Sequence, residues 1–444
     1  LACMWVNEAA SNGFTSTLRH GGALELRFLA WLYWHAALNT NATLKKSPEV
    51  AAVLESADIQ GILRHLPIEK GETPLALAPS YEQRALDILT KSDFTELWKD
   101  PSVNFELHWD RFADVPTVFS SAWYDSYTRA NLENYVGLSQ RNKGPYRLLM
   151  GPWTHGDSFM GYSFAGDIDL GPEAAIDYNT ERLRWFDRWL KGLASGVDND
   201  SPVSIFVMGG GNGRRNKAGR LNHGGRWREE REWPLARSTG VRYYLRPNGI
   251  LSPTPHKRIS AYSTFQFDPD EPVPTVGGNI SSLDSLIPPP AYISDPSTLP
   301  AAARRHPITP NGGWDQRERR DLFGAHPPYT SPLGARKDVL VFQTSPLKQD
   351  IEVTGPIEVI LWVASDAPDT DFTAKLIDLY PPNKDYPEGY ALNISDSIFR
   401  MRYRDSWEHP KMMQQGEVYQ MAITLYPTSN LFVVGHRIRL DISS

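Results

Sequence analysis

Residues 115–156 decide the fold of this chain, and they read VPTVFSSAWYDSYTRANLENYVGLSQRNKGPYRLLMGPWTHG. Two apolar, strand-like runs lie inside the stretch, at residues 115–121 and 146–150. Each run leads into a polar residue that chemistry can use, first Asp125 and then His155. The pattern therefore predicts two strands, each followed closely by a candidate catalytic side chain.

A helix is predicted between the two strands, because apolar residues recur at three- and four-residue spacings over residues 127–138. In a doubly wound sheet, strands joined by such a helix are parallel, and their carboxyl ends face one crevice. Asp125 and His155 are therefore expected to meet as the acid and base of a catalytic triad. Taken singly, such an Asp is commonly a turn residue or helix N-cap, and such a His a structural hydrogen-bonding group. Their order and joint placement favour catalysis.

The segments that hold these two residues resemble those of a known family. Trp123-Tyr124-Asp125 after the first strand and Gly151-Pro-Trp-Thr-His-Gly156 after the second are similar to the acid and histidine segments of the cocaine esterase-like hydrolases. These α/β-hydrolases are related to the Xaa-Pro dipeptidyl-peptidases and the α-amino acid ester hydrolases. The resemblance implies a triad in the chain order Ser, Asp, His.

The same resemblance implies residues that line the substrate pocket. Tyr127 matches a position where the family places a pocket aromatic, and packing in the core is an equal alternative for it. Trp123 is the second pocket candidate, although support of the acid loop is the preferred interpretation of this residue.

The nucleophile of the expected triad does not occur in the sequence, because no G-x-S-x-G pentapeptide is present. The family places this serine upstream of the acid, and the chain begins at Leu1 without a Met. Residues 441–444 stop inside strand-like sequence. We therefore expect a fragment that lacks the nucleophile and the oxyanion donors and is inactive by itself.

The chain is predicted to contain three regions. Residues 1–18 and 104–196 are assigned to the core of an α/β-hydrolase with a partial, doubly wound sheet, and residues 19–103 resemble the family's helical lid. From residue 197 to 444 the helical period nearly vanishes and short alternating runs follow one another. This pattern predicts an all-β jelly-roll sandwich. The same half resembles the C-terminal domain of the family, which implies a sandwich of the galactose-binding-like type. Its long Pro- and Gly-rich insertion, residues 254–337, is expected to wrap the hydrolase domain.

Two local expectations concern the hydrolase region. Residues 1–18 are interpreted as the tail of a helix followed by a loop. Residues 179–193 predict an amphipathic helix that Gly192 ends. The side chains expected to pack this helix on the sheet are Leu183, Phe186, Trp189 and Leu190.

Composition limits the classes of partner. The net charge of −6 is mild, so nothing indicates binding to nucleic acid or to a membrane surface. Cys3 is the only cysteine, which rules out an internal disulfide, and no apolar run of about 20 residues indicates a membrane span. We expect a soluble protein, cytoplasmic or exported, without a cofactor. Its expected substrate is a small ester, amide or short peptide, and the family resemblance makes a homo-oligomer possible.

Other patterns give weaker indications of a site. Residues 209–213, GGGNG, follow a strand as a phosphate-binding loop does, but neither a helix nor G-K-[ST] follows, so a hairpin or loop is preferred. Asp366, Asp369 and Asp371 are spaced as Ca²⁺ ligands can be, but the loop glycine and distal Glu are missing. No H-E-x-x-H or His/Cys cluster indicates zinc. We expect no metal site.

The leading hypothesis is a serine hydrolase that cleaves carboxylic esters or amides through an acyl-enzyme. The alternative among enzymes is an Xaa-Pro dipeptidyl-peptidase or α-amino acid ester hydrolase, which needs acidic side chains for a free α-ammonium group. The sequence shows no such cluster. The alternative from another class is a carbohydrate- or partner-binding protein whose jelly roll does the binding, because this architecture hosts many functions.

Overall fold

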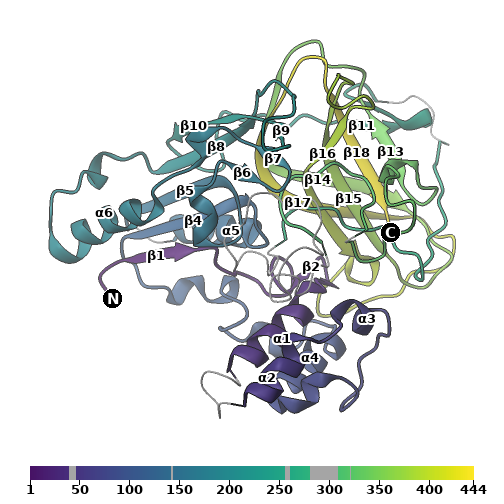
Figure 1. Cartoon of the computed structure of the whole chain (residues 1–444), viewed down its shortest axis with the longest axis horizontal. Coiled ribbons are helices and arrows are strands. Elements are labelled where there is room, and N and C mark those ends of the chain that lie inside the picture. Colours follow the sequence, from purple (N-terminus) through teal and green to yellow (C-terminus); the bar gives the residue numbers. More distant parts are fainter. Residues whose placement is uncertain (40–46, 142–143, 256–260, 281–308, 321) are drawn as a thin grey trace.

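The protein is described by a computed structural model, which covers residues 1–39, 47–141, 144–255, 261–280, 309–320 and 322–444. Figure 1 shows a mixed α/β part formed by the first half of the chain and a β-rich part formed by the second, with a group of helices below both. This arrangement confirms the predicted order of an α/β region followed by an all-β region.

The first sheet is built from parallel strands. β1 (Met4–Asn7) pairs with β4 (Thr117–Tyr124), and β4 pairs with β5 (Tyr146–Thr154). β8 (Val203–Gly209) follows in parallel beside β5, and β10 (Gly225–Glu230) pairs antiparallel with β8. Every residue of β4 is buried, as expected for a parallel strand covered on both faces.

The strand, helix and strand predicted around Asp125 and His155 are confirmed. Helix α5 (Thr128–Ser139) connects β4 to β5, and the two strands run parallel with Thr117 opposite Tyr146. Its apolar side packs on β4, where Phe119 and Tyr135 make an edge contact. Both candidate residues therefore stand at the same end of the sheet.

The expectation of a helix tail and loop at the start of the chain is wrong, because Met4–Asn7 forms the strand β1. Its register sets Met4 opposite Thr117 and Asn7 opposite Ser120. The strand has four residues, which is too short to show a periodic pattern, and its partner lies far along the sequence. Pairing with β4 therefore decided the conformation here.

Helix α6 (Tyr178–Lys191) forms as predicted, and Gly192 ends it in the left-handed conformation at φ 71°. Its packing face differs from the prediction. Leu183 and Leu190 are 55% and 60% exposed, whereas Trp185 is 4% exposed. The helix carries two apolar stripes, and the one that contains the large indole, with Phe186 and Trp189 beside it, packs near β1.

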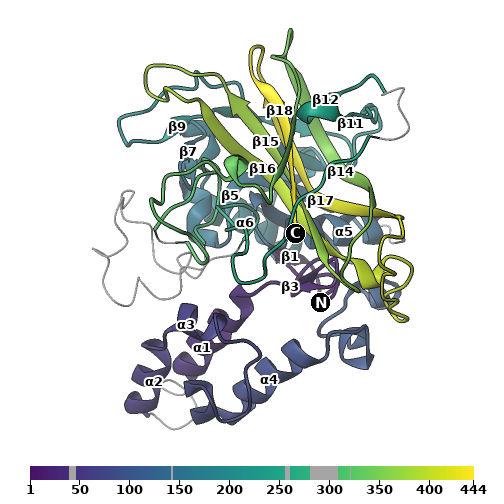
Figure 2. The ribbon, with the colours of Figure 1, turned by 90° about the vertical axis from the view of Figure 1, so that its right-hand side faces the viewer.

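The first helices form a separate group with its own core. They are α1 (Arg27–Asn39), α2 (Pro48–Glu55), α3 (Ile59–Leu63) and α4 (Pro79–Thr90). Their buried side chains include Leu29, Leu32, Tyr33, Leu54, Ile59 and Ile88. In both Figure 1 and Figure 2 this group lies apart from the two large sheets. Its role as a lid stays a prediction.

The second half of the chain forms two packed layers of strands, as Figure 2 shows. One layer has the order β11 (Tyr244–Arg246), β12 (Ile250–Ser252), β13 (Leu340–Gln343), β18 (Arg437–Ser443), β15 (Asp371–Tyr380) and β16 (Tyr390–Arg400). The other is the antiparallel pair β14 (Ile351–Val363) and β17 (Tyr419–Phe432). Buried residues of both layers join one hydrophobic core. The jelly-roll topology stays a prediction.

The described part of the chain also contains several short strands. They are β2 (Arg19–His20), β3 (Ala23–Leu24), β6 (Phe164–Ala165), β7 (Ile168–Asp169) and β9 (Leu221–Asn222). Among the helices of the described part of the chain, none has both the length and the apolar character needed to cross a bilayer.

The two halves share one sheet. The boundary predicted near residue 197 falls just before β8, and β8 lies in the first sheet because Val203 pairs with Leu148 of β5. The end of β8 also pairs with β17 of the second half, where Met208 lies opposite Asn430. A strand predicted by its position in the sequence to lie in the β-rich half therefore belongs by its hydrogen bonds to both parts.

The insertion predicted at residues 254–337 is only partly within the described residues, which omit 256–260, 281–308 and 321. Where it is described, it contacts the first half of the chain. Gly313 forms a bridge with Gly166, and the amide of Asn279 donates to the carbonyl of Trp123.

Candidate active site at the ends of β4 and β5

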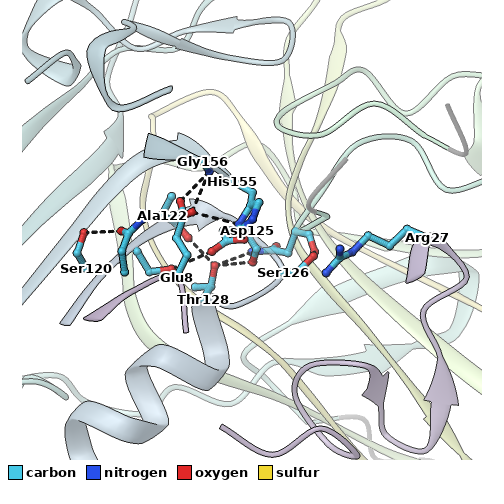
Figure 3. A network of polar contacts seen from close by, with 12 residues as sticks. Glu8, Arg27, Ser120, Ala122, Asp125, Ser126, Thr128, His155 and Gly156 are labelled. Atoms are coloured by element: carbon cyan, nitrogen blue, oxygen red, sulfur yellow. Dashed lines mark hydrogen bonds and ion pairs between the residues drawn. The ribbon is translucent and has the colours of Figure 1, made fainter. Parts of the chain in front are cut away.

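Asp125 and His155 lie directly after neighbouring parallel strands, and the structure brings their side chains together (Figure 3). The Nδ1–H of His155 donates to Oδ1 of Asp125 over 2.9 Å. The Asp125 side chain is fully buried, whereas the imidazole is 29% exposed. One nitrogen of the ring is thus tied to a buried carboxylate while the ring itself still reaches solvent.

Local hydrogen bonds fix the carboxylate of Asp125. The Ser121 hydroxyl donates to its Oδ2 over 3.1 Å, and the Thr128 hydroxyl donates to its backbone carbonyl over 2.7 Å. Thr128 begins helix α5, so the acid loop is tied to both the strand before it and the helix after it. This fixes the direction in which Asp125 presents its oxygen to the imidazole.

Glu8 is a third member of the cluster that sequence reasoning missed. It follows β1, and its side chain is only 4% exposed. The backbone N–H of Gly156 donates to both of its carboxylate oxygens, at 3.0 and 2.9 Å. Its Oε2 also lies 3.2 Å from Nδ1 of His155. No motif marks this Glu in the sequence, because its partners come from a strand that is distant along the chain.

The electrostatics of the site favour a protonated imidazole. Burial by itself lowers the pKa of His155, but the charges of Asp125 and then Glu8 outweigh it and raise the pKa to about 9. The guanidinium of Arg27 acts in the opposite direction. The ring therefore carries a proton on both nitrogens at neutral pH and loses one as the pH approaches 9.

Tyr127 lies beside His155, with ring centroids 5.3 Å apart. The guanidinium carbon of Arg27 is 5.8 Å from the Tyr127 ring centroid, and its Nε donates to Glu25 over 2.5 Å. Glu25 also accepts from the hydroxyl of Ser126, next to the acid, over 3.2 Å. Tyr127 is half-buried, and its predicted pocket role stays a prediction.

Trp123, the other pocket candidate, points into the protein. Its side chain is fully buried, and its indole N–H donates to the carbonyl of Phe206 over 2.7 Å. The ring packs against Trp233 with centroids 5.8 Å apart. These contacts give Trp123 a supporting position under the acid loop, and its pocket role stays a prediction.

The cluster at His155 has the spacing that a bound metal needs, because one ligand atom each of Glu8, Asp125 and His155 lies within 4.8 Å of the others. Both carboxylates, however, already accept hydrogen bonds from His155 or Gly156. Nδ1–H of His155 donates to Asp125, and Oε2 of Glu8 lies 3.2 Å from the same nitrogen as an ion-pair contact. We therefore assign these side chains as hydrogen-bonding partners and not as metal ligands.

The other two sequence patterns have structural partners. The N–H groups of Gly209, Gly211 and Gly213 donate to backbone carbonyls of residues 222–224, so they form a loop and no phosphate cradle. Asp369 and Asp371 are each ion-paired with an arginine. These pairs neutralise both carboxylates and argue against Ca²⁺ binding there.

Comparisons with known proteins match both halves of the chain. The family profile of the X-Pro dipeptidyl-peptidase C-terminal non-catalytic domain matches residues 195–444. The profile of the X-Pro dipeptidyl-peptidase (S15 family) matches residues 1–157. The first of these covers more than half of the chain.

Curated and solved relatives agree with these profiles. A cocaine esterase from Rhodococcus sp. (strain MB1 Bresler) is 28% identical over 442 residues, which covers 96% of this chain and 65% of that esterase. An α-amino acid ester hydrolase structure aligns with a TM-score of 0.67 at 20% identity, covering 100% of this chain and 65% of that one. An aminopeptidase structure from a marine sediment Thaumarchaeota archaeon aligns with a TM-score of 0.65 at 19% identity. The alignment covers 99% of this chain and 64% of the aminopeptidase.

The chain thus spans about two thirds of the length of these relatives. The solved structures share its fold, and the family profiles cover its two halves. Through residues 195–444 the chain belongs to the family of the X-Pro dipeptidyl-peptidase C-terminal non-catalytic domain, and its first part is similar to the X-Pro dipeptidyl-peptidases of the S15 family.

Proposed function

We propose that this chain supplies the acid and the histidine of a serine hydrolase that cleaves carboxylic esters or amides through an acyl-enzyme. The observation that carries the proposal is the 2.9 Å contact between His155 and buried Asp125 at the ends of neighbouring parallel strands. Membership of the family and the likeness to a cocaine esterase support it.

In this proposal His155 takes the proton from the attacking serine and later gives it to the leaving group. The serine oxygen forms a bond to the carbonyl carbon, the bond to the leaving group breaks, and water then hydrolyses the acyl-enzyme. Asp125 holds the imidazole with its proton on Nδ1 and stabilises the ring cation. The serine and the oxyanion donors are assigned to residues outside these 444, since no G-x-S-x-G occurs among them.

The remaining parts of the chain have supporting roles in the proposal. The helices within residues 19–103 act as a lid over the site. Tyr127, which lies against His155, lines the pocket for the acyl or leaving group. The strands after residue 197 form a jelly roll whose inserted segment, through Asn279, supports the acid loop.

A dipeptidyl-peptidase that cleaves after Xaa-Pro is the second candidate, because both family profiles carry that description. It would need a carboxylate to bind the α-ammonium group of the substrate. Glu25 is a candidate because it accepts from Ser126 beside the acid, but Arg27 and His20 already engage its carboxylate. This pairing favours the esterase, and the ratio of kcat/KM for an aryl ester over an Xaa-Pro anilide decides between them.

The test uses the full-length gene product. We expect hydrolysis of a short-chain p-nitrophenyl ester that rises with pH toward the His155 pKa of about 9. Asp125→Asn and His155→Ala are expected to lower kcat by about 10³-fold or more. If either variant keeps near wild-type turnover, the assignment of the triad is wrong. Glycan binding without any esterase activity would instead favour the binding-protein alternative.

A further inference from the structure

Glu8 has a backbone conformation that is unusual for its residue type. Its φ is +48°, in the left-handed region that glycine tolerates best. Its N–H donates to the carbonyl of Ser120 over 2.8 Å, which continues the pairing of β1 with β4 by one residue. The unfavourable φ at a residue fixed in this way indicates that its side chain has a defined place.

The carboxylate of Glu8 reaches the same imidazole nitrogen as Asp125. Nδ1 of His155 lies 2.9 Å from Oδ1 of Asp125 and 3.2 Å from Oε2 of Glu8. Both carboxylates are nearly or fully removed from solvent. Figure 3 shows both side chains beside His155, and they follow β1 and β4 respectively. One N–H group therefore faces two buried acceptors.

We propose that Glu8 is a second acid for His155, a positioning residue that shares with Asp125 the task of holding Nδ1 protonated and stabilising the ring cation. Its value for catalysis rests on the proposed function, whereas its contact with His155 does not. Its second role is to fix the loop after β5, because the N–H of Gly156 donates to both of its oxygens.

The groups that face His155 make this role electrostatically significant. Asp125 and Glu8 are the two carboxylates, Arg27 is the opposing cation, and the neutral ring of Tyr127 lies alongside. Two acids against one guanidinium favour the imidazolium form. Removing the Glu8 carboxylate therefore weakens the preference for the imidazolium form, while the carboxylate of Asp125 remains.

The test measures the pKa of His155 in the 444-residue chain by NMR, with ¹³C-labelled histidine and His155→Gln to assign the resonance. Glu8→Gln keeps an oxygen for the Gly156 N–H and removes only the charge. We expect the pKa to fall by about one unit, the lower end of the effect of an opposite charge within about 4–6 Å. The resonance of the Nδ1–H that donates to Asp125 is expected to shift as well.

Glu82→Gln is the matched control. Glu82 is also a buried Glu that accepts a hydrogen bond from a glycine N–H, that of Gly71 at 2.6 Å, but it lies in the helical group. We expect it to leave the His155 pKa unchanged. If Glu8→Gln moves that pKa no more than Glu82→Gln does, the proposal is overturned.

Glu8→Gly keeps the test decisive if the Gln variant does not fold. Glycine adopts a φ of +48° without strain, so this change removes the carboxylate and preserves the turn. The same fall in the His155 pKa is expected, and an unchanged pKa would refute a second acid.

Activity of the full-length gene product provides the catalytic readout. With Glu8 present, Asp125→Asn retains an acceptor for Nδ1–H, so Glu8→Gln combined with Asp125→Asn is expected to lose about tenfold more kcat than Asp125→Asn alone, the factor that one pKa unit represents. Equal loss in the single and double variants would overturn the role of Glu8. If even the wild-type protein hydrolyses no ester, the proposed function fails, while the NMR titration still decides whether Glu8 acts on His155.

Discussion

The chain contains a second His–Asp pair whose geometry nearly equals that of the candidate site. In the β-rich half, Nδ1–H of His436 donates to Oδ1 of Asp378 over 2.8 Å, against 2.9 Å for His155 and Asp125. Both aspartates are fully buried. The imidazoles differ, because His155 is 29% exposed and His436 is 9% exposed.

The surroundings of the second pair belong to a core. The ring of Tyr380 lies 4.1 Å from that of His436, centroid to centroid. The Tyr380 hydroxyl donates to Nδ1 of a buried neighbour, His223, over 2.5 Å, and Nε2–H of His223 donates to Asn430 over 2.9 Å. These side chains come from strands β15 and β17 and from the loops before β10 and β18. Every polar partner is internal, so nothing points toward a substrate.

The comparison teaches that a short His–Asp hydrogen bond identifies an active site only when the outer part of the ring is accessible. At His155 the pair stands at the carboxyl ends of parallel strands and the ring reaches solvent. The His436–Asp378 pair instead packs between the two layers of strands. The first pair is therefore placed for chemistry, and the second for stability.

The largest difference is expected in catalysis by the natural protein. His155→Ala should lower kcat for a p-nitrophenyl ester by about 10³-fold or more, because it removes the proposed base. His436→Ala should change kcat by less than tenfold while it lowers the melting temperature. Steady-state kinetics and thermal unfolding of both variants test this crossed pattern, and a loss of kcat at His436 equal to that at His155 would contradict it.

The order reverses for folding stability. Asp378→Ala leaves His436 without its buried partner and should cost about 3–5 kcal/mol of unfolding free energy. Asp125→Ala should cost less than about 2 kcal/mol, since His155 keeps Glu8 and some contact with water. Urea unfolding of the 444-residue chain measures both values, and equal losses would remove the distinction.

His155 and His223 should change the free energy of unfolding in opposite directions as the pH rises. Burial lowers the pKa of His223 to about 4, so between pH 6.5 and 4 the unfolded chain binds more protons and stability falls as the pH falls. The pKa of His155 is raised to about 9, so its contribution is complete below pH 6.5 and is lost as the pH rises through 9. Each shift corresponds to about 3 kcal/mol at most.

Unfolding curves measured from pH 4 to pH 10 test these signs. His155→Gln should flatten the alkaline side of the stability profile, and His223→Gln the acidic side. The prediction fails if either substitution leaves its side of the profile as steep as in the wild type, or if it flattens the opposite side.

The smallest effects are expected from a matched pair of Tyr→Phe substitutions. Tyr380→Phe removes the hydroxyl that donates to buried His223 and should cost about 1–3 kcal/mol. Tyr127→Phe keeps the ring beside His155 at a half-exposed position and should cost less than about 1 kcal/mol. A larger cost at Tyr127 would show that its hydroxyl, near Arg27, is a structural element of the site.

The centre of the site was predictable because it follows from local pattern and one rule of topology. Two apolar runs with a helical period between them specify parallel neighbours, and this alone brings Asp125 and His155 to one edge. Glu8 had no such signal. Its place depends on β1 pairing with β4, a contact between segments far apart in sequence, and on a positive φ that a Glu seldom adopts.

The same limit explains the errors in the fold. Leu183 and Leu190 share one stripe of α6, and the large ring of Trp185 lies on another. Periodicity establishes that the helix is amphipathic but does not decide which of two apolar stripes packs inward. β8 similarly carries a clear strand pattern, yet only its hydrogen bonds to β5 reveal which sheet it joins.

The strand β8 also bears on how such a protein can be divided and inherited. The profile of the C-terminal family unit begins at residue 195, just ahead of β8, while β8 pairs with β5 of the preceding unit. A gene that exchanges its second half for that of a relative therefore also exchanges a strand of its first sheet. The exchanged half would bring its own β8, and that strand would have to pair with the β5 that stayed behind. The sequences of β8 and β5 must therefore remain compatible with each other.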